Sequence, residues 1–286
     1  MIKVFIVNDK AGHGKSKEVS KFIYDLFRND SDTFIINSSS KQQTIQIAKN
    51  FKFDNVVVYS VGGDGTLNDI INGLAGGNAY LGIIPCGSGN DFIRNISSDT
   101  NEINLGLVNN RYFINVISFG IDAEVANKVN ELNKYGRSKI PYPRSIATVF
   151  PKYKPENINL DGIEKQITIL SICNGSYYGN GIPIAPAAII NDNLLDLYLV
   201  EKTSKLEMLH LFSKLLKGKH VESPKVQHQF IKNLKINSLN PIICNIDGEI
   251  IVDNNFDISL QKNTIHYYQE NNVELKKLIV PYMKKF

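Results

Sequence analysis

The stretch Tyr59-Ser-Val-Gly-Gly-Asp-Gly-Thr-Leu-Asn-Asp-Ile-Ile-Asn-Gly-Leu74 decides how this chain is interpreted. An apolar, strand-like run enters three glycines packed around one aspartate, and a helical pattern follows. A plain turn rarely requires three glycines, whereas glycine lets backbone amides approach a polyphosphate. Thr66 can cap the following helix, and Asp64 can hold Mg²⁺ or orient a hydroxyl. The stretch therefore predicts a ligand-binding loop, and a simple turn with a capping threonine is the alternative.

The same loop does not fit the dinucleotide-binding pattern. A G-x-G-x-x-G fingerprint that begins at Gly63 requires a third glycine at position 68, where the chain has Asn68. We therefore expect the loop to bind its ligand in another way.

Strand-like and helix-like segments alternate on both sides of this stretch. Strands are expected at residues 2–7, 34–37, 55–61 and 80–84, and helices at residues 19–27, 44–50 and 66–74. Such alternation predicts a parallel sheet covered by helices. Ligands of such sheets bind where the carboxyl ends of strands meet the starts of helices.

A second glycine loop, NDKAGHGKS, occupies residues 8–16 after the first expected strand. It resembles the end of a Walker A loop, but that pattern requires glycine at position 9, where the chain has Asp9. Gly12 and Gly14 would let backbone amides converge on phosphate, and Lys15 would add positive charge. An ordinary glycine turn with a surface lysine is the alternative.

A third glycine loop, PCGSGNDFIR, occupies residues 85–94. It lacks the residue that separates glycine from serine in the hydrolase elbow G-x-S-x-G, so a serine nucleophile is not expected. Ser88, Asn90, Asp91 and Arg94 would suit a phosphorylated or hydroxylated ligand. Alternatively, serine or asparagine caps a helix here and the arginine is solvated.

From about residue 103 the pattern changes to short strand-like runs separated by Gly, Asn, Asp and Pro. These runs cover residues 111–118, 165–174, 194–200, 234–238, 242–247, 256–260 and 264–268, with helices expected at 145–153 and 206–216. They predict a second domain, an antiparallel sandwich or barrel. Its acidic segments, at residues 120–122, 191–196 and 245–249, are each more typical of a turn than of a site.

The last residues predict an amphipathic helix. Its apolar face consists of Leu275, Leu278, Ile279, Tyr282, Met283 and Phe286, with Lys276, Lys277, Lys284 and Lys285 around it. A helix docked on the body and interrupted at Pro281 is the first interpretation. A helix that touches a membrane is the alternative.

The composition indicates a globular protein without a nucleic-acid partner. The chain has 286 residues, 43% of them apolar, and a net charge of only +4 that is spread along the chain. Its scattered cysteines, Cys86, Cys173 and Cys244, fit neither a disulfide framework nor a zinc site. Because no signal-like start and no membrane-length apolar run is present, we expect a cytoplasmic protein. The sequence also allows peripheral attachment to the inner membrane face.

Taken in order, these motifs resemble those of the bacterial lipid kinase family that shares its catalytic domain with diacylglycerol and sphingosine kinases. The resemblance covers residues 2–268. The family's Gly-Gly-Asp-Gly-Thr loop matches residues 62–66 completely, and its Pro-x-Gly-Thr-x-Asn-Asp-Phe segment matches residues 85–92, with serine in place of threonine. Its N-terminal Asn-Pro-x-x-Gly-x-Gly-Lys loop matches residues 8–15, with aspartate in place of proline.

Later segments follow the same family. Residues 118–123 match Ser-x-Gly-x-Asp-Ala, residues 174–186 match a glycine-rich turn, and residues 247–249 match Asp-Gly-Glu. Residues 192–196 correspond to an Asp-Gly-x-Leu-Asp turn that is associated with a structural metal, with asparagine at the usual glycine. The resemblance implies that Asp192 binds this metal and that Asp122 joins a metal and water network.

The resemblance also implies the fold class and the activity. It implies an α/β nucleotide-binding domain with a parallel sheet at residues 1–108, an all-β sandwich domain for lipid substrate and metal at residues 109–269, and an active site in the interdomain cleft. The tail at residues 270–286 is expected to pack on the first domain. The implied activity is phosphorylation of a lipid hydroxyl, of diacylglycerol or a related lipid, by ATP with Mg²⁺ at a membrane surface. The resemblance leaves open whether the protein forms a homodimer.

The implied roles fall on residues of the motifs. The nucleotide-binding candidates are Asn8, Gly12, Gly14, Lys15, Gly62, Gly63, Gly65, Thr66 and Arg94, and the substrate-binding candidates are Ser88, Asn90 and Asp91. Asp64 would act through Mg²⁺ or on the acceptor hydroxyl, and Glu249 or Asp247 is the candidate base. Two alternatives remain: an NAD kinase, which shares the Gly-Gly-Asp-Gly-Thr loop but usually continues differently, and a non-catalytic regulator that binds nucleotide or lipid.

Overall fold

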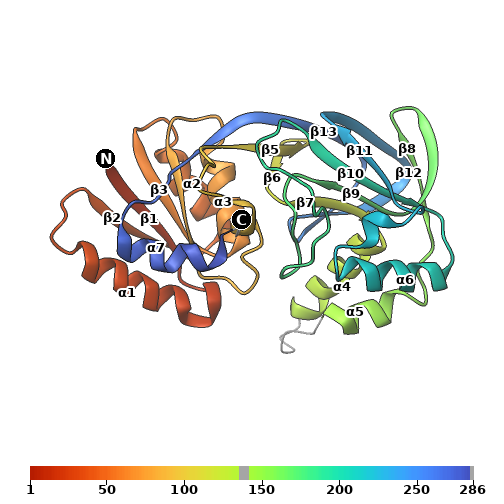
Figure 1. Ribbon diagram of the computed structural model, residues 1–286, viewed down its shortest axis with the longest axis horizontal. Helices are drawn as coiled ribbons and strands as arrows, with labels where there is room; N and C mark the ends of the chain where they lie inside the picture. Colours follow the sequence, from red (N-terminus) through yellow and green to blue (C-terminus); the bar gives the residue numbers. More distant parts are fainter. Residues whose placement is uncertain (135–141, 284–286) are drawn as a thin grey trace.

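A parallel sheet forms the centre of the N-terminal domain in the computed structural model, which describes residues 1–134 and 142–283 (Figure 1). Its strands lie in the order β4 (Tyr80–Pro85), β3 (Val56–Gly62), β1 (Ile2–Asn8) and β2 (Thr33–Ser38). The helices between them are α1 (Lys15–Phe27), α2 (Lys41–Asn50) and α3 (Asp64–Leu74). Because the pairing is parallel, the carboxyl ends of β1, β3 and β4 lie at the same edge of the sheet.

The side chains of β1 alternate between two apolar layers. Val4 and Ile6 pack in a cluster with α2 and α3, whereas Phe5 and Val7 pack with α1 and with the C-terminal helix α7 (Val273–Ile279). Successive side chains of a strand point to opposite faces, so a continuous apolar run suits a strand that is covered on both sides. The edge formed by the strand ends is therefore where a ligand can reach the sheet.

Antiparallel strands follow β4 in the chain, and those after β5 form most of the C-terminal domain. They are β5 (Glu102–Val108), β6 (Arg111–Phe113), β7 (Val116–Gly120), β8 (Glu156–Leu160), β9 (Ile163–Cys173), β10 (Leu195–Glu201), β11 (Gln227–Ile231), β12 (Asn233–Ile246) and β13 (Glu249–Tyr267). Strand β9 pairs with β7, β8 and β10, and β12 pairs with β7, β8 and β13. Helices α4 (Ile121–Lys134), α5 (Tyr142–Val149) and α6 (Lys205–Leu215) lie below these strands in Figure 1.

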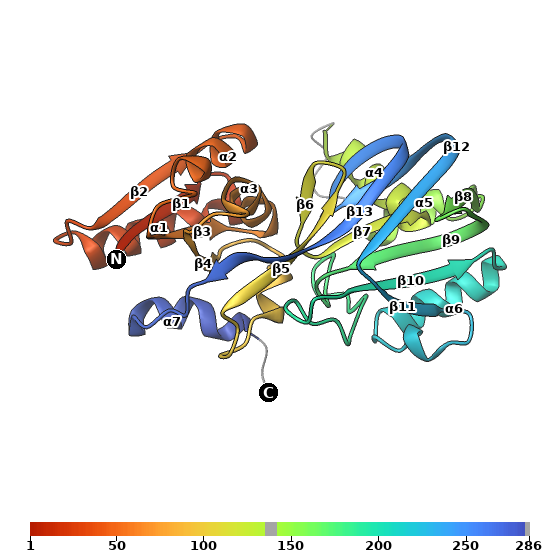
Figure 2. The same cartoon turned by 90° about the horizontal axis from the view of Figure 1, so that it is seen from above.

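Strand β13, 19 residues long, joins the two domains. It pairs antiparallel with β12 and β5, and its last residues pair in parallel with β4, where His266 lies opposite Tyr80. One sheet therefore continues through both domains, and Figure 2 shows β13 crossing from one to the other.

After β13 the chain returns to the N-terminal domain and ends on it. Leu275 is fully buried there and Ile279 is only 3% exposed, so the apolar face of this helix is turned toward the protein and not toward a membrane. Phe286, Lys284 and Lys285, which the sequence also places on this helix, lie outside the described residues. Within residues 1–134 and 142–283, no helix has the length and apolar character needed to cross a bilayer.

Several elements differ from those expected from the sequence. The strand expected at residues 111–118 is divided into β6 and β7, and α4 follows where the sequence predicts only a turn. The four runs expected between residues 234 and 268 form two long strands, β12 and β13, each with a shift of register. After β4 the chain forms only a short 3-10 helix, η2 (Phe92–Asn95). In both long strands the pairing resumes after the shift of register, so each strand continues past it.

Candidate active site

Three loops meet at the carboxyl ends of β1, β3 and β4. A Cβ atom added to Gly87 would lie 2.5 Å from the Cα atom of Gly63, and one added to Gly12 would collide with the carbonyl oxygen of Cys86. Glycine at these positions therefore lets the backbones of neighbouring loops touch. In contrast, a Cβ atom at Gly14 or Gly65 would meet nothing within 4 Å, so these two glycines can admit a ligand.

Asp64 ties the second loop to the third. It is the first residue of α3, and its two carboxylate oxygens accept hydrogen bonds from the amides of Asp91 and Phe92, each at 3.0 Å. The first loop is held by Asn8, whose Nδ2 donates to Thr66 Oγ1 at 3.0 Å. The carboxylate expected to hold a metal or a hydroxyl therefore also shapes the site.

Asp91 connects the third loop to the C-terminal domain. Its Oδ2 accepts a hydrogen bond from the amide of Asn180 at 2.8 Å. Its Oδ1 is buried and has no hydrogen-bond partner among the described residues, with Arg94 Nε the charged atom nearby at 3.7 Å. Burial, together with the charge of Asp64, raises the pKa of Asp91. The two domains therefore meet at this carboxylate.

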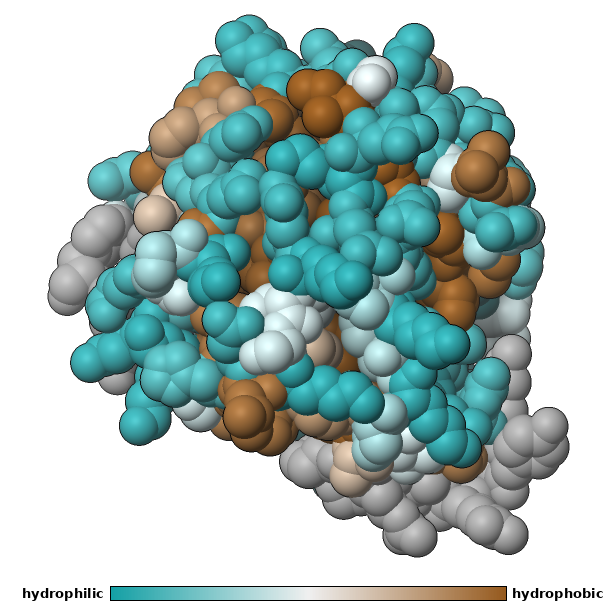
Figure 3. Space-filling view, turned by 90° about the vertical axis from the view of Figure 1, so that its right-hand side faces the viewer, coloured by the Kyte–Doolittle hydropathy of each residue, from teal (hydrophilic) through white to brown (hydrophobic). Residues whose placement is uncertain are grey.

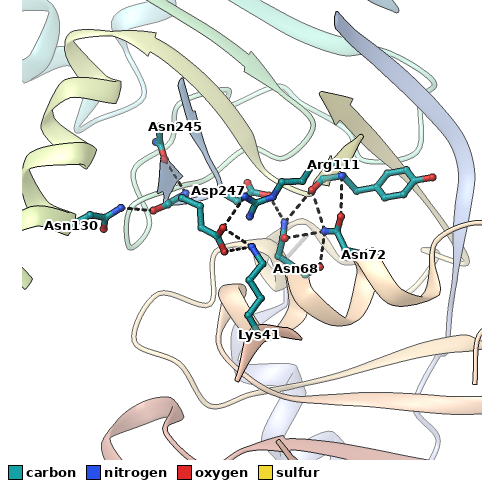
Figure 4. A network of polar contacts seen from close by, with 10 residues as sticks. Lys41, Asn68, Asn72, Arg111, Asn130, Asn245 and Asp247 are labelled. Atoms are coloured by element: carbon teal, nitrogen blue, oxygen red, sulfur yellow. Dashed lines mark hydrogen bonds and ion pairs between the residues drawn. The ribbon is translucent and has the colours of Figure 1, made fainter. Parts of the chain in front are cut away.

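Asp247 forms a second bridge between the domains (Figure 4). It lies with Gly248 in the two-residue turn between β12 and β13, and both have positive φ, +48° and +92°. Its carboxylate accepts hydrogen bonds from Asn68 of α3 at 2.8 Å and from the amides of residues 114, 115 and 116 at 2.6 to 3.0 Å. These amides point at Asp247 and not at a neighbouring strand, which explains the break between β6 and β7. Burial raises the pKa of Asp247 to about 6.

Glu249 lies between two cations from different parts of the chain. Lys41 Nζ, at the start of α2, donates to Glu249 Oε1 at 2.7 Å, and Arg111 of β6 is 2.7 Å from Oε2. Burial opposes ionisation of Glu249, but the two ion pairs prevail and hold its pKa below the ordinary value. Nearby Asp69 is 9% exposed, and its burial raises its pKa to about 6. Lys41, Arg111 and Asp69 were not among the residues predicted from the sequence.

Asp122 belongs to a polar network at the start of α4. Tyr178 Oη donates to its Oδ1 at 2.7 Å, and Ser118 Oγ donates to its Oδ2 at 2.5 Å. Ser118 in turn accepts a hydrogen bond from Asn245 at 3.2 Å. Through Ser118, Asp122 is thus linked to Asn245, which precedes Asp247 by two residues.

A cleft of about 570 Å³ lies between the three loops and the C-terminal domain. The predicted site residues that line it are Asn8, Gly12, Gly63, Asp64, Gly65, Thr66, Ser88, Asp91 and Asp247. The C-terminal domain contributes Asn115, Tyr178, Asn180 and Asn245, together with α4. Most of these groups are polar, so the cleft suits a polar ligand.

Other predicted residues are engaged elsewhere. Lys15 donates to Tyr282 Oη at 3.1 Å, a contact that raises the pKa of the lysine. Arg94 donates to the carbonyl of Gly89 at 3.3 Å and lies over the ring of Tyr177. Asn90 closes its own loop, because its side chain bonds both the amide and the carbonyl of Gly87 at 2.9 Å. Gly62 packs directly beneath Thr66.

Asp192, the predicted ligand of a structural metal, already has a hydrogen-bond partner. Its Oδ1 accepts a hydrogen bond from the amide of Leu194 at 2.9 Å, while Asp196 is 2.7 Å from Nε2 of His228. Asn193, where the family usually has glycine, adopts a φ of +66°. Within the part of the chain that the structure describes, no three His, Cys, Asp or Glu side chains gather as a metal-binding group.

A narrow apolar cavity adjoins the cleft. Helices α4, α5 and α6 and strands β9 and β10 surround it, with Ile121, Phe150, Ile169, Val200, Leu211 and Phe212 among the lining residues. Tyr178 lines both the cavity and the cleft, and Asp122 lines the cavity. Sequence reasoning missed this cavity, because its walls come from elements up to a hundred residues apart.

The glycine loops of the α/β domain and the β-rich domain across the cleft define a two-domain protein of mixed class. The family model for the diacylglycerol kinase catalytic domain matches residues 3–111, and the model for the YegS C-terminal NAD kinase beta sandwich-like domain matches residues 115–265. The chain belongs to the diacylglycerol kinase family in which these two domains are combined.

Known proteins resemble the chain over most of its length. A diacylglycerol kinase of Staphylococcus haemolyticus (strain JCSC1435) is 28% identical over 228 residues, which are 72% of this chain and 68% of that protein. One of Bacillus subtilis (strain 168) is 27% identical over 219 residues, 69% of this chain and 72% of that protein. A crystal structure from Bacillus anthracis str. Sterne has a TM-score of 0.73 at 24% identity, over 94% of this chain and 97% of that one, which shows a shared fold.

Proposed function

We propose that the protein is an ATP-dependent lipid kinase that transfers the γ-phosphoryl group to the hydroxyl of diacylglycerol or a related lipid. Family membership supports the kinase activity. The apolar cavity beside the polar cleft supports a lipid acceptor, since a hydrocarbon chain in the cavity would leave its polar end at Tyr178 in the cleft. Ser171 Oγ, buried in the wall of the cavity without a partner among the described residues, could donate to an ester carbonyl.

The nucleotide is proposed to lie on the three glycine loops. Gly14 and Gly65 leave open space where phosphate oxygens can approach backbone amides. Thr66 lines the same space and is oriented by Asn8. Lys15 and Arg94 lie at the border of the loops, where they would exchange their present partners for phosphate charge.

Mg²⁺ is proposed to arrive with the nucleotide. Asp64 and Asp91 line the cleft and offer carboxylate oxygens, the ligand type that Mg²⁺ prefers. In kinases this ion is commonly held by one or two carboxylates and the substrate phosphates, so a protein-only cage is not required. Bound there, Mg²⁺ would neutralise charge on the transferred group. Asp122 supports the same region through its network with Tyr178.

Glu249 is our candidate for the base. The acceptor oxygen bonds to the γ-phosphorus, the bond from that phosphorus to the ADP oxygen breaks, and the hydroxyl proton passes to a carboxylate. Its two cations keep Glu249 ionised at neutral pH, and a loose transition state asks little of a base. Asp247, whose oxygens already accept four hydrogen bonds, positions Glu249 two residues further on.

The active site is therefore proposed to lie in the cleft between the domains. We place the domain boundary between residues 108 and 109, in the turn that joins β5 to β6. The protein would work at the inner membrane surface, where its lipid substrate resides.

An acceptor panel tests this function. Purified protein is incubated with Mg²⁺ and ATP and with diacylglycerol, monoacylglycerol, ceramide, sphingosine or NAD, and the products are identified by mass spectrometry. We expect phosphorylated product from at least one lipid alcohol and none from NAD. Formation of NADP alone would favour an NAD kinase, and no turnover of any acceptor would favour a non-catalytic regulator.

A further inference from the structure

Helix α6 is apolar on two opposite sides. Its inner side chains, Met208, Leu211 and Leu215, are buried and line the apolar cavity. Its outer side includes Leu206, which is 81% exposed, and Leu216, the residue that directly follows the helix, is 52% exposed. No protein element covers the exposed leucines on this outer face in the described structure, and exposed apolar patches of this kind are typical of interaction surfaces.

The outer leucines form one stripe with a fixed position. Leu206, Leu209 and Leu216 recur at spacings of three and seven residues, which places them on the same side of the helix. Leu209 is 50% exposed and also borders the apolar cavity. Exposed Val221 of the adjacent 3-10 helix lies close by in the chain. A capping box of Ser204 and Glu207 fixes the first turn, so the leucines are displayed on an ordered helix and not on a frayed end.

The charge around α6 is positive. Residues 202–225 contain six lysines and two glutamates, an excess equal to the net charge of +4 of the whole chain, so the positive charge is less evenly spread along the chain than expected from the sequence. Glu207 is already paired with Lys225 at 3.3 Å. Lys217 and Lys219 are exposed beside the last leucine of the stripe. Figure 3, a view of the end of the molecule formed by the C-terminal domain, shows separate apolar patches set among polar side chains.

We propose that the outer face of α6, with Leu206, Leu209, Leu216 and Val221 and the lysines that follow them, is the surface by which the protein docks on an anionic lipid bilayer. Leucines would enter the interface between headgroups and acyl chains, and lysines would attract the anionic headgroups. Helix α6 then separates the bilayer from the apolar cavity by one helix diameter, so a lipid chain has a short path from membrane to cleft. This inference rests on the proposed lipid kinase function and specifies which side of the protein faces the membrane.

Sedimentation with vesicles tests the docking surface. The full chain is mixed with phosphatidylcholine vesicles with or without phosphatidylglycerol, at low and high salt. We expect the wild type to bind the anionic vesicles and to be released by salt. The double variant Leu206→Glu with Leu216→Glu should bind at least about tenfold more weakly. Lys217→Glu with Lys219→Glu should lose the preference for anionic vesicles. Leu239→Glu, at a 99% exposed leucine where the register of β12 shifts, is the matched control and should bind normally.

Turnover of a short-chain, water-soluble diacylglycerol separates this inference from the proposed function. Neither double variant changes a residue of the cleft or the cavity wall, so both should retain this turnover. Wild-type binding by the leucine variant, or no vesicle binding by the wild type, would overturn the inference even if the enzyme is active. An absence of turnover with every lipid alcohol would instead count against the kinase, whatever the vesicles show.

Discussion

Lys41 and Glu249, which are separated by 208 residues in the chain, form an ion pair across the two domains, with Lys41 Nζ 2.7 Å from Oε1 and 2.5 Å from Oε2. Because this pair helps to hold the pKa of Glu249 low, Lys41→Ala should raise that pKa. If ionised Glu249 is the base, the acid limb of the pH profile should then shift to higher pH, because Glu249 becomes protonated at a higher pH in the variant. The measurement is kcat/KM against pH for wild type and variant.

The exposed lysine of the same helix provides the control. Lys49→Ala should leave the acid limb of the pH profile where it is in the wild type, since Lys49 makes no ion pair with Glu249 among the described contacts. An acid limb that does not move in Lys41→Ala would exclude Glu249 as the titrating group.

Asp247 should matter for stability more than its short side chain suggests. Asp247→Asn replaces an acceptor oxygen by an NH₂ group that faces backbone N–H donors, so we expect a loss of about 2 to 4 kcal/mol in the free energy of unfolding. Asp257→Asn, at an exposed position of β13, should change it by less than about 0.5 kcal/mol. Urea unfolding of both variants measures these losses. Equal losses for Asp247→Asn and Asp257→Asn would contradict a structural role for the hydrogen bonds to Asp247.

Two glycines of the loops should respond differently to alanine. A Cβ atom on Gly87 would press on the Cα atom of Gly63 at 2.5 Å, so Gly87→Ala should lower the free energy of unfolding by about 1 to 3 kcal/mol. Gly65→Ala meets no atom and lies in helix α3, so it should be neutral or stabilising by up to about 1 kcal/mol. In a kinase, however, it should raise the KM for ATP. A stable Gly87→Ala protein would contradict the contact between the loops.

Glu156 should make stability depend on pH. Its burial, together with the nearby charge of Glu124, raises the pKa of this carboxyl to about 7 from 4.5. Because the folded state holds this proton more tightly than the unfolded state, Glu156 contributes favourably to the free energy of unfolding below pH 4.5. This contribution is lost as the pH rises through about 7. Glu156→Gln should therefore be more stable than wild type by about 1 to 3 kcal/mol at pH 8 and equal to it at pH 4.5. Exposed Glu164→Gln serves as the control, and a constant difference between Glu156→Gln and wild type would contradict the assignment.

The three loops could be predicted because their signals are local. Each glycine loop follows an apolar strand in the sequence, and the structure has β1, β3 and β4 at those positions. The sequence predicts that these glycines give a ligand access to the backbone, but Gly63 and Gly87 also allow two loops to touch. No local sequence pattern predicts that contact.

The groups around Glu249 could not be predicted in this way. Lys41 and Arg111 reach it only because β13 carries Glu249 back beside α2 and β6. Helix α4 did have a signal, with Ile121, Val125 and Val129 at helical spacing, but Gly120 before it and Asp122 in its first turn suggested a turn. The division of residues 111–118 depends on Asp247, which is more than a hundred residues away.

Asp64 bears the central claim, that the cleft is the site of a lipid kinase. Asp64→Asn keeps the size of the side chain and one of its two acceptors, so it should fold, whereas Asp64→Ala loses both bonds to the third loop. Asp25→Ala, at an exposed position of α1, is the matched control. The unfolding midpoint of each protein shows whether it is folded before turnover is compared.

The most direct measurement is kcat/KM for diacylglycerol phosphorylation by folded Asp64→Asn, beside wild type and Asp25→Ala. We expect Asp64→Asn to be at least about 100-fold slower and Asp25→Ala to equal wild type. Folded Asp64→Asn with wild-type turnover would contradict the account.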